Sequence, residues 1–119
     1  MSESIIRPPK PVYKEVVREF QYKGARVRVV KWLFGLSCAQ NDPDEFTVYI
    51  DSHFLNLLTK DELDLVLNHE IEEMKLMRKG IPWPIAHRRI ASKEPPLKRA
   101  EIIRKCGQAH RQRLREKGN

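Results

Sequence analysis

Two segments near the start of the chain carry the apolar and polar pattern of β-strands. In residues 25–33, valine alternates with arginine, which is typical of a strand that has one solvated face. Residues 12–20 are rich in β-branched and aromatic residues, and residues 21–24 between the two segments supply a short turn. We therefore predict a hairpin, followed by a polar turn at 41–44 and a third strand over 45–51.

Helical spacing dominates the second half of the chain. The strongest signal predicts a helix over 60–79, because the side chains of Thr59 and Glu62 can cap its first turn reciprocally. Gly80 suits the left-handed conformation that ends many helices. Shorter patterns predict a brief apolar helix over 54–58 and two main helices over about 84–94 and 97–117.

These elements predict one α+β domain. A chain of 119 residues is long enough to bury a single core. We expect a flexible arm over 1–11 and a single domain over 12–119, in which a small antiparallel or mixed three-stranded sheet packs against three main helices. No apolar run approaches the roughly 18 residues of a membrane span, and the first residues lack the apolar core of a signal peptide. We therefore expect a cytoplasmic protein without a membrane partner.

The cysteines and two of the histidines carry little signal of chemistry. Cys38 and Cys106 lie far apart and form no CxxC pair, so neither a disulfide framework nor a cysteine zinc knuckle is indicated. Cys38 follows an apolar run and is expected to be buried. His53 precedes a short apolar helix and His110 lies in the basic tail, and both are expected to face solvent.

Charge divides the chain into three sections. The net charge of +7 is the balance of a basic start, an acidic middle over 40–73 and a strongly basic end. A basic helix over 97–117 can contact nucleic acid or an acidic partner protein, and it can equally neutralise the acidic section of its own chain. No aromatic residue is interleaved with these charges, so the signature of base stacking is missing. The candidate contact residues are Arg104, Lys105, Arg111, Arg113 and Arg115.

Ionisable residues gather at the predicted core face of two successive helices. In the helix 60–79, Glu70 projects near the middle of the apolar stripe, and His69 and Glu73 lie on its flank. His87 and Glu94 share one face of the next helix, which a short connection can pack against the first. Burying unpaired charges costs several kcal/mol, so such a cluster must be paired, protonated or bound to a metal.

The string His69-Glu70-Ile71-Glu72-Glu73 resembles the HExxH helix of zincin metallopeptidases, with glutamate in place of the second histidine. The longer pattern, which continues through Gly80, Pro82, His87 and Glu94, is similar to small zincin-like proteins of prokaryotes and their viruses. The likeness covers about residues 46–94. It implies a zinc-dependent hydrolase of the metallopeptidase type, or a metal-binding protein, with a peptide or protein as the substrate.

Carried over position by position, the resemblance implies Zn²⁺ ligands at His69, Glu73 and His87. It implies that Glu70 is the general base, and that Glu94 is an additional ligand or a partner that orients His87. The alternative is a binding module without enzymatic activity, in which the same five residues form a buried polar network and the basic helix contacts nucleic acid or an acidic protein. Metal content distinguishes the two hypotheses.

Overall fold

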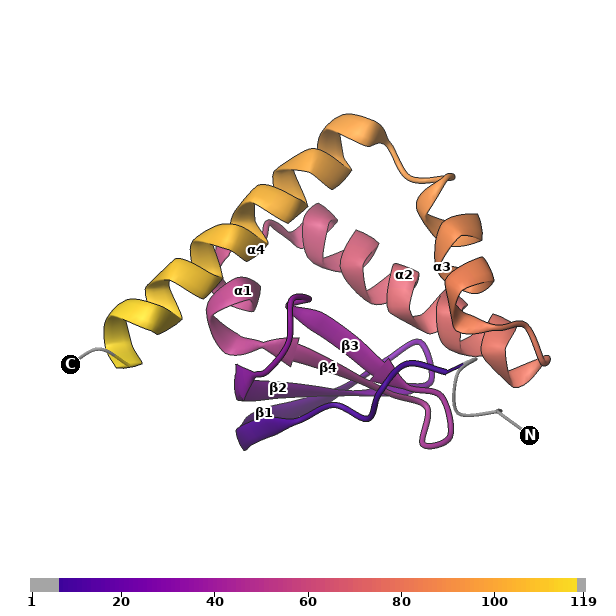
Figure 1. Cartoon of the computed structure of the whole chain (residues 1–119), viewed down its shortest axis with the longest axis horizontal. Coiled ribbons are helices and arrows are strands. Elements are labelled where there is room, and N and C mark those ends of the chain that lie inside the picture. Colours follow the sequence, from indigo (N-terminus) through magenta and orange to yellow (C-terminus); the bar gives the residue numbers. More distant parts are fainter. Residues whose placement is uncertain (1–6, 118–119) are drawn as a thin grey trace.

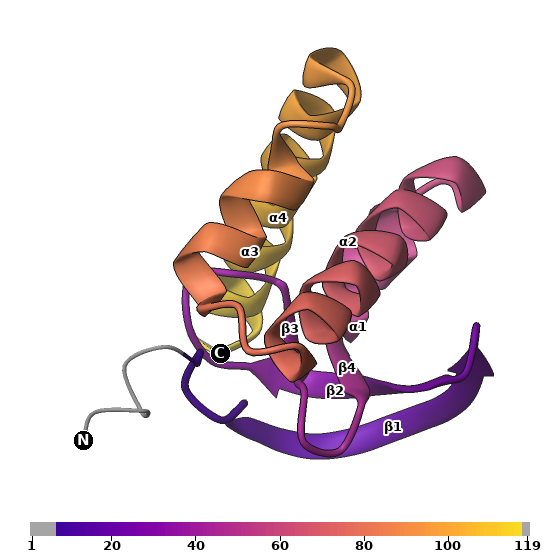
Figure 2. The same ribbon diagram turned by 90° about the vertical axis from the view of Figure 1, so that its right-hand side faces the viewer.

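The computed structural model describes residues 7–117 as one α+β unit, in which the helices lie on one side of a twisted sheet (Figures 1 and 2). Residues 1–6 of the predicted arm lie outside the described residues. The elements are β1 (Tyr13–Tyr22), β2 (Ala25–Leu33), β3 (Ala39–Asp42), β4 (Thr47–Asp51), α1 (Ser52–Leu57), α2 (Lys60–Arg78), α3 (Trp83–Ala91) and α4 (Pro96–Lys117). None of the helices within residues 7–117 is both long enough and apolar enough to cross a membrane.

The sheet is mixed and has the strand order β1-β2-β4-β3 within the described residues. β1 and β2 form the predicted antiparallel hairpin, β2 and β4 are parallel, and β3 pairs antiparallel with β4. The hairpin turn is tighter than predicted, because Lys23 and Gly24 both adopt positive φ angles, of 48° and 83°. A two-residue turn of this kind matches the twist of the flanking strands. β1 therefore extends to Tyr22.

The prediction of a three-stranded sheet missed β3, which is the fourth strand of the sheet within the described residues. Its sequence, Ala39-Gln40-Asn41-Asp42, has no apolar alternation and was assigned in part to a polar turn. Within residues 7–117, β3 lies at the edge of the sheet and pairs only with β4, with Asn41 opposite Val48. An edge strand of four residues is specified by its partner strand more than by its own sequence. The β3 strand brings Asn41 towards α2.

The core lies between the sheet and α2, as the apolar stripe predicted. Val27, Val29 and Ile50 from the sheet pack with Leu67 and Ile71 of α2. Because residues three and four apart share one face of a helix, this packing also turns Glu70 and Glu73 inward. Both carboxyl groups are buried, and Glu73 is only 2% exposed.

The two ends of α2 are set by Thr59, Glu62 and Gly80, the residues from which they were predicted. The hydroxyl oxygen of Thr59 accepts from the backbone N–H of Glu62, and the backbone N–H of Thr59 donates to Glu62 Oε1 at 2.9 Å. At the other end, Gly80 has a φ of 95°, and the next backbone N–H, of Ile81, donates to the carbonyl of Leu76. α3 ends at Ala91, three residues before the predicted end, and α4 begins at Pro96.

Replacing Thr59 with alanine should lower the free energy of unfolding by about 1 kcal/mol, because the first turn of α2 loses its capping oxygen. Urea unfolding followed by circular dichroism measures the change. Lys60→Ala, at the neighbouring exposed position, is the matched control and should change stability much less. Equal destabilisation by both substitutions would show that the capping box contributes little.

Candidate metal centre

Three of the predicted site residues meet where α3 packs against α2. His69 and Glu73 lie one turn apart on α2, and the short connection after Gly80 returns the chain so that α3 places His87 beside them. Glu73 Oε2 lies 2.6 Å from His69 Nε2 and 2.6 Å from His87 Nδ1, and the two imidazole nitrogens are 3.2 Å apart. The structure therefore brings together the two histidines and the glutamate that the sequence proposed as ligands.

Glu94 also reaches the cluster, although its contact differs from the predicted one. It was expected to serve as an additional ligand or to orient His87, but its Oε2 lies 2.7 Å from His69 Nδ1. Its other oxygen accepts from Nη1 of Arg99 at 3.1 Å. α3 ends at Ala91, so Glu94 lies beyond the helix, and that turn directs its side chain back towards α2. Glu94 thus orients the other histidine, His69.

Two residues that the sequence analysis did not propose complete the polar cluster. Asn41 of β3 donates through Nδ2 to Glu70 Oε1 at 2.8 Å and to Glu73 Oε1 at 3.2 Å. The indole Nε1 of Trp83 donates to Glu73 Oε1 at 3.3 Å. Nothing in the sequence pointed to Asn41, because its neighbours are typical of a turn. The signal for Trp83 was its indole N–H, which needs a partner when the ring fills a corner between helices.

One buried polar atom of this cluster is unsatisfied. Among the described residues, Asn41 Oδ1 has no hydrogen-bond partner. A buried acceptor without a partner costs about 1–3 kcal/mol, so this oxygen is free to accept from a further donor or to contact a cation. This acceptor lies beside Glu70 and Glu73, on the same amide that holds both carboxyl groups.

The close packing of these groups shifts their ionisation. Burial alone would lower the pKa of the His69 imidazole, but its hydrogen bond with Glu73 and the charges of Glu70, Glu73 and Glu94 outweigh burial and raise that pKa to about 9. Burial, reinforced by the charge of Glu73, raises the pKa of Glu70 to about 8. Burial also acts to raise the pKa of Glu73, but the hydrogen bonds and charges of His69 and His87 outweigh it and keep that pKa below its ordinary value.

Two cavities adjoin the cluster. One, of about 420 Å³, is lined by His69 and Glu94 together with apolar residues of α2 and α4. The other, of about 510 Å³, is lined by Asn41, Glu73 and Trp83. Glu70 and His87 line both. Volumes of this size are in the range of small-molecule and substrate pockets, so the short chain still provides room beside the site.

The donor set fits a zinc ion. Zinc takes imidazole nitrogens at about 2.0–2.1 Å and carboxylate oxygens at about 2.0–2.2 Å, so tetrahedral ligand atoms stand about 3.3–3.5 Å apart. The separation of 3.2 Å between the nitrogens of His69 and His87 is close to that value, and all three donor atoms lie within 4.8 Å of one another. The two 2.6 Å contacts of Glu73 are hydrogen-bond distances. A metal ion would therefore compete with the protons that these contacts now share.

The basic helix, α4, is largely engaged with its own chain. Three of the five predicted contact residues bind protein groups: Arg104 contacts Glu101, Lys105 contacts Glu62, and Arg113 donates to the backbone carbonyl of Leu33. Arg111 and Arg115 are exposed. The contact between Lys105 and Glu62 is the kind of pairing with the acidic section that the charge pattern allowed. Contact of α4 with nucleic acid or an acidic protein stays a prediction.

Comparison with known proteins adds no relative to this picture: no family model, no curated protein and no solved structure matches the chain. A fold alone does not define a function, whereas the geometry and chemistry of a site can support one. The arrangement of His69, Glu70, Glu73, His87 and Glu94 is therefore the basis of the functional proposal.

Proposed function

We propose that the protein binds one zinc ion through His69, Glu73 and His87 and is a zinc-dependent hydrolase of peptide bonds. The observation that carries this proposal is the convergence of His69 Nε2, Glu73 Oε2 and His87 Nδ1 from two helices onto one point. Two imidazoles and a carboxylate are a common ligand set for catalytic zinc, which keeps a fourth position for water or substrate.

Glu94 supports this role for His69. By accepting a hydrogen bond from Nδ1, a carboxylate fixes the imidazole so that Nε2 faces Glu73 and His87. Such a partner is a regular feature of histidine ligands, since it holds the ring and strengthens the nitrogen as a donor. Arg99 holds Glu94 from the other side and balances its charge.

In this proposal Glu70 is the proton acceptor. A bound zinc ion would supply Lewis acidity and would make water a better nucleophile near neutral pH. Glu70 lines both cavities beside the ligand set, and its Oε1 is held by Asn41 at 2.8 Å. Burial raises the pKa of Glu70 to about 8 in the metal-free protein, so the group is mostly neutral there, and the positive charge of a bound zinc ion nearby would favour the carboxylate. As a carboxylate, Glu70 would take the proton of an attacking water and return it to the leaving amine.

The test is a zinc titration of the untagged protein, prepared without reductant and without added metal, together with elemental analysis. We expect about one equivalent of zinc in the wild type. Loss of a group that only holds a metal ligand in place typically costs about 10- to 100-fold in metal affinity. His87→Ala removes a ligand itself, so it should weaken zinc affinity by at least that much. His53→Ala, which removes a histidine outside the cluster, is the matched control and should bind as the wild type does.

A wild-type protein that binds no zinc at micromolar concentrations would contradict the proposal. The same is true if His87→Ala and wild type bind zinc equally. In either case the cluster would be a hydrogen-bonded polar network, in which a protonated His69 bridges Glu73 and Glu94.

A further inference from the structure

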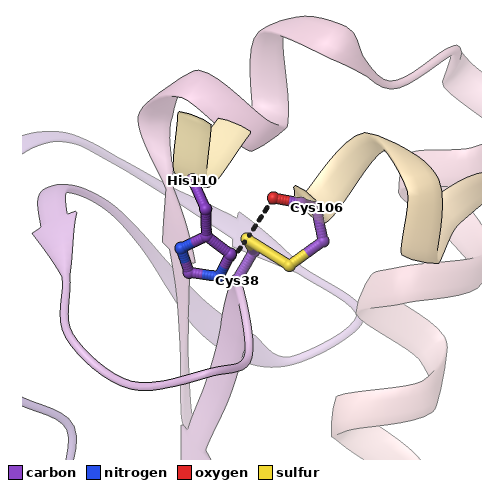
Figure 3. Close-up of side chains that lie close together, drawn as sticks. All are labelled: Cys38, Cys106 and His110. Carbon is purple, nitrogen blue, oxygen red and sulfur yellow. Dashed lines mark hydrogen bonds between the residues drawn. A yellow bond between two sulfur atoms is a disulfide. The ribbon is translucent and has the colours of Figure 1, made fainter. Parts of the chain in front are cut away.

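A second group of potential metal ligands lies outside this centre, where α4 meets the segment between β2 and β3. Cys38 and Cys106 are joined as a disulfide although 68 positions separate them, and His110 follows Cys106 by one helical turn (Figure 3). The spacing of the two cysteines did not indicate a disulfide, and the structure corrects that interpretation. The expectation that His53 and His110 face solvent was wrong, because both are partly buried against other elements. Cys38 is only 4% exposed, as predicted.

The three side chains are held close by contacts other than the S–S bond. Their donor atoms lie within 4.8 Å of one another. His110 donates through Nε2 to the carbonyl of Leu36 at 3.0 Å, and Arg113 binds the carbonyl of Leu33. Elsewhere on α4, Lys105 pairs with Glu62 of α2. These contacts dock α4 on the body of the protein, so they should keep the cysteines adjacent after reduction.

We propose that, when the disulfide is reduced, Cys38, Cys106 and His110 form a second zinc site. Thiolate and imidazole donors together favour zinc among the common divalent ions. Zinc bonds of about 2.3 Å to sulfur and about 2.0 Å to nitrogen, at a tetrahedral angle, place the two donor atoms about 3.5 Å apart. Cys38 Sγ lies 3.6 Å from His110 Nε2, which matches that separation. The same two cysteines thus serve either as a disulfide or as zinc ligands.

A phosphine can open the S–S bond and free both sulfur atoms for zinc. A phosphine reductant gives two electrons to the S–S bond, the two sulfur atoms take up two protons, and the oxygen of a water molecule ends on phosphorus as a phosphine oxide. Zn²⁺ then displaces the two thiol protons, because the thiolate is the form that binds metal. The neutral His110 ring then changes tautomer: Nε2 releases to solvent the proton that it donates to Leu36, and Nδ1 takes up a proton, so that the Nε2 lone pair can bind the ion.

The site would have an open fourth position. All three residues line the cavity of about 420 Å³ that also contains His69 and Glu94. A water molecule in that cavity can complete a tetrahedral set of two thiolates and one imidazole. Arg113 lies behind the imidazole ring, where its Nη2 donates to Nδ1 at 3.5 Å in the oxidised protein; this guanidinium would turn away when Nδ1 takes up the proton, and Nε2 stays on the side of Cys38.

The experiment compares zinc binding by the oxidised protein and by protein reduced with a phosphine, with Co²⁺ as a spectroscopic probe of thiolate ligation. Reduced wild type should bind one more equivalent of zinc than oxidised wild type, and its Co²⁺ complex should show sulfur-to-cobalt charge-transfer absorption. His110→Ala should weaken the additional binding at least 10-fold, whereas the control His53→Ala should leave it unchanged.

The inference does not depend on the proposed function, and His87→Ala separates the two. His87→Ala should still bind one additional equivalent of zinc after reduction, even though the substitution weakens zinc binding at the site of His69 and Glu73. Equal zinc content before and after reduction would overturn the inference, and so would additional binding that His110→Ala leaves intact. Circular dichroism of the reduced protein is the check on folding. Loss of structure on reduction would also overturn the inference, because α4 would then depend on the S–S bond for its place.

Discussion

Replacing Glu70 with glutamine should abolish peptide hydrolysis and leave zinc binding intact. The amide has the shape of the carboxylate but cannot accept the proton of an attacking water. Loss of a general base typically costs about 10²- to 10⁴-fold in rate. None of the three converging ligand atoms belongs to Glu70, so the zinc content of Glu70→Gln should stay near one equivalent. Turnover of unfolded casein or of a peptide library, measured beside zinc content, gives both quantities.

The matched control for this substitution is Glu72→Gln. Glu72 lies on the solvent side of the same helix and pairs only with Lys75, at 3.2 Å, among the described residues. It should keep the activity of the wild type. Undiminished hydrolysis by Glu70→Gln would remove Glu70 from the role of base. Joint loss of activity and zinc would show instead that Glu70 holds the metal or the fold.

The metal-free protein should lose stability as the pH rises from about 6.5 to 9. The folded state raises the pKa of His69 from 6.5 to about 9, so the folded protein holds this proton over a range in which the unfolded chain releases it. The stabilisation is complete below pH 6.5 and is lost as the pH rises through 9. One pKa unit corresponds to 1.36 kcal/mol, so the loss attributable to His69 is of the order of 3 kcal/mol.

Glu70 acts in the same direction. Its pKa, raised from 4.5 to about 8, means that the folded protein favours the neutral carboxyl group, and the associated stability falls as the pH rises through that value. Urea unfolding of chelator-treated protein at several pH values measures the sum. His69→Gln should flatten the dependence, and the control His53→Gln should not. A stability that is constant or increases from pH 6.5 to 9 would contradict the assigned protonation of the cluster.

Bound zinc should remove the loss of stability that the metal-free protein shows as the pH rises. The ion and the His69 proton compete for Nε2, so zinc affinity should increase with pH over the same range. The stability of zinc-saturated protein should therefore hold or rise where that of the metal-free protein falls. This comparison separates a metal centre from a purely hydrogen-bonded network.

Local interactions determined what the sequence could predict. α2 was predictable because both of its ends depend on residues that are neighbours in the chain. The capping pair of Thr59 and Glu62 sets its start, and Gly80 in the left-handed conformation sets its end. Once that helix and its apolar stripe were known, the spacing of 3.6 residues per turn already placed His69 and Glu73 on adjoining inward positions. The hairpin of β1 and β2 followed in the same way from alternation and a short turn.

Contacts between distant segments decided the rest. β3 has no pattern of its own, so only its pairing with β4 made it a strand and placed Asn41 beside Glu70 and Glu73. The turn after α3 directed Glu94 to His69, because the position of a loop side chain depends on the packing of the helices that it joins. The sequence by itself therefore determined the helices, the hairpin and the inward face of α2. Only the tertiary structure brought Cys38, Cys106 and His110 together, because their proximity depends on where α4 docks, which no local pattern encodes.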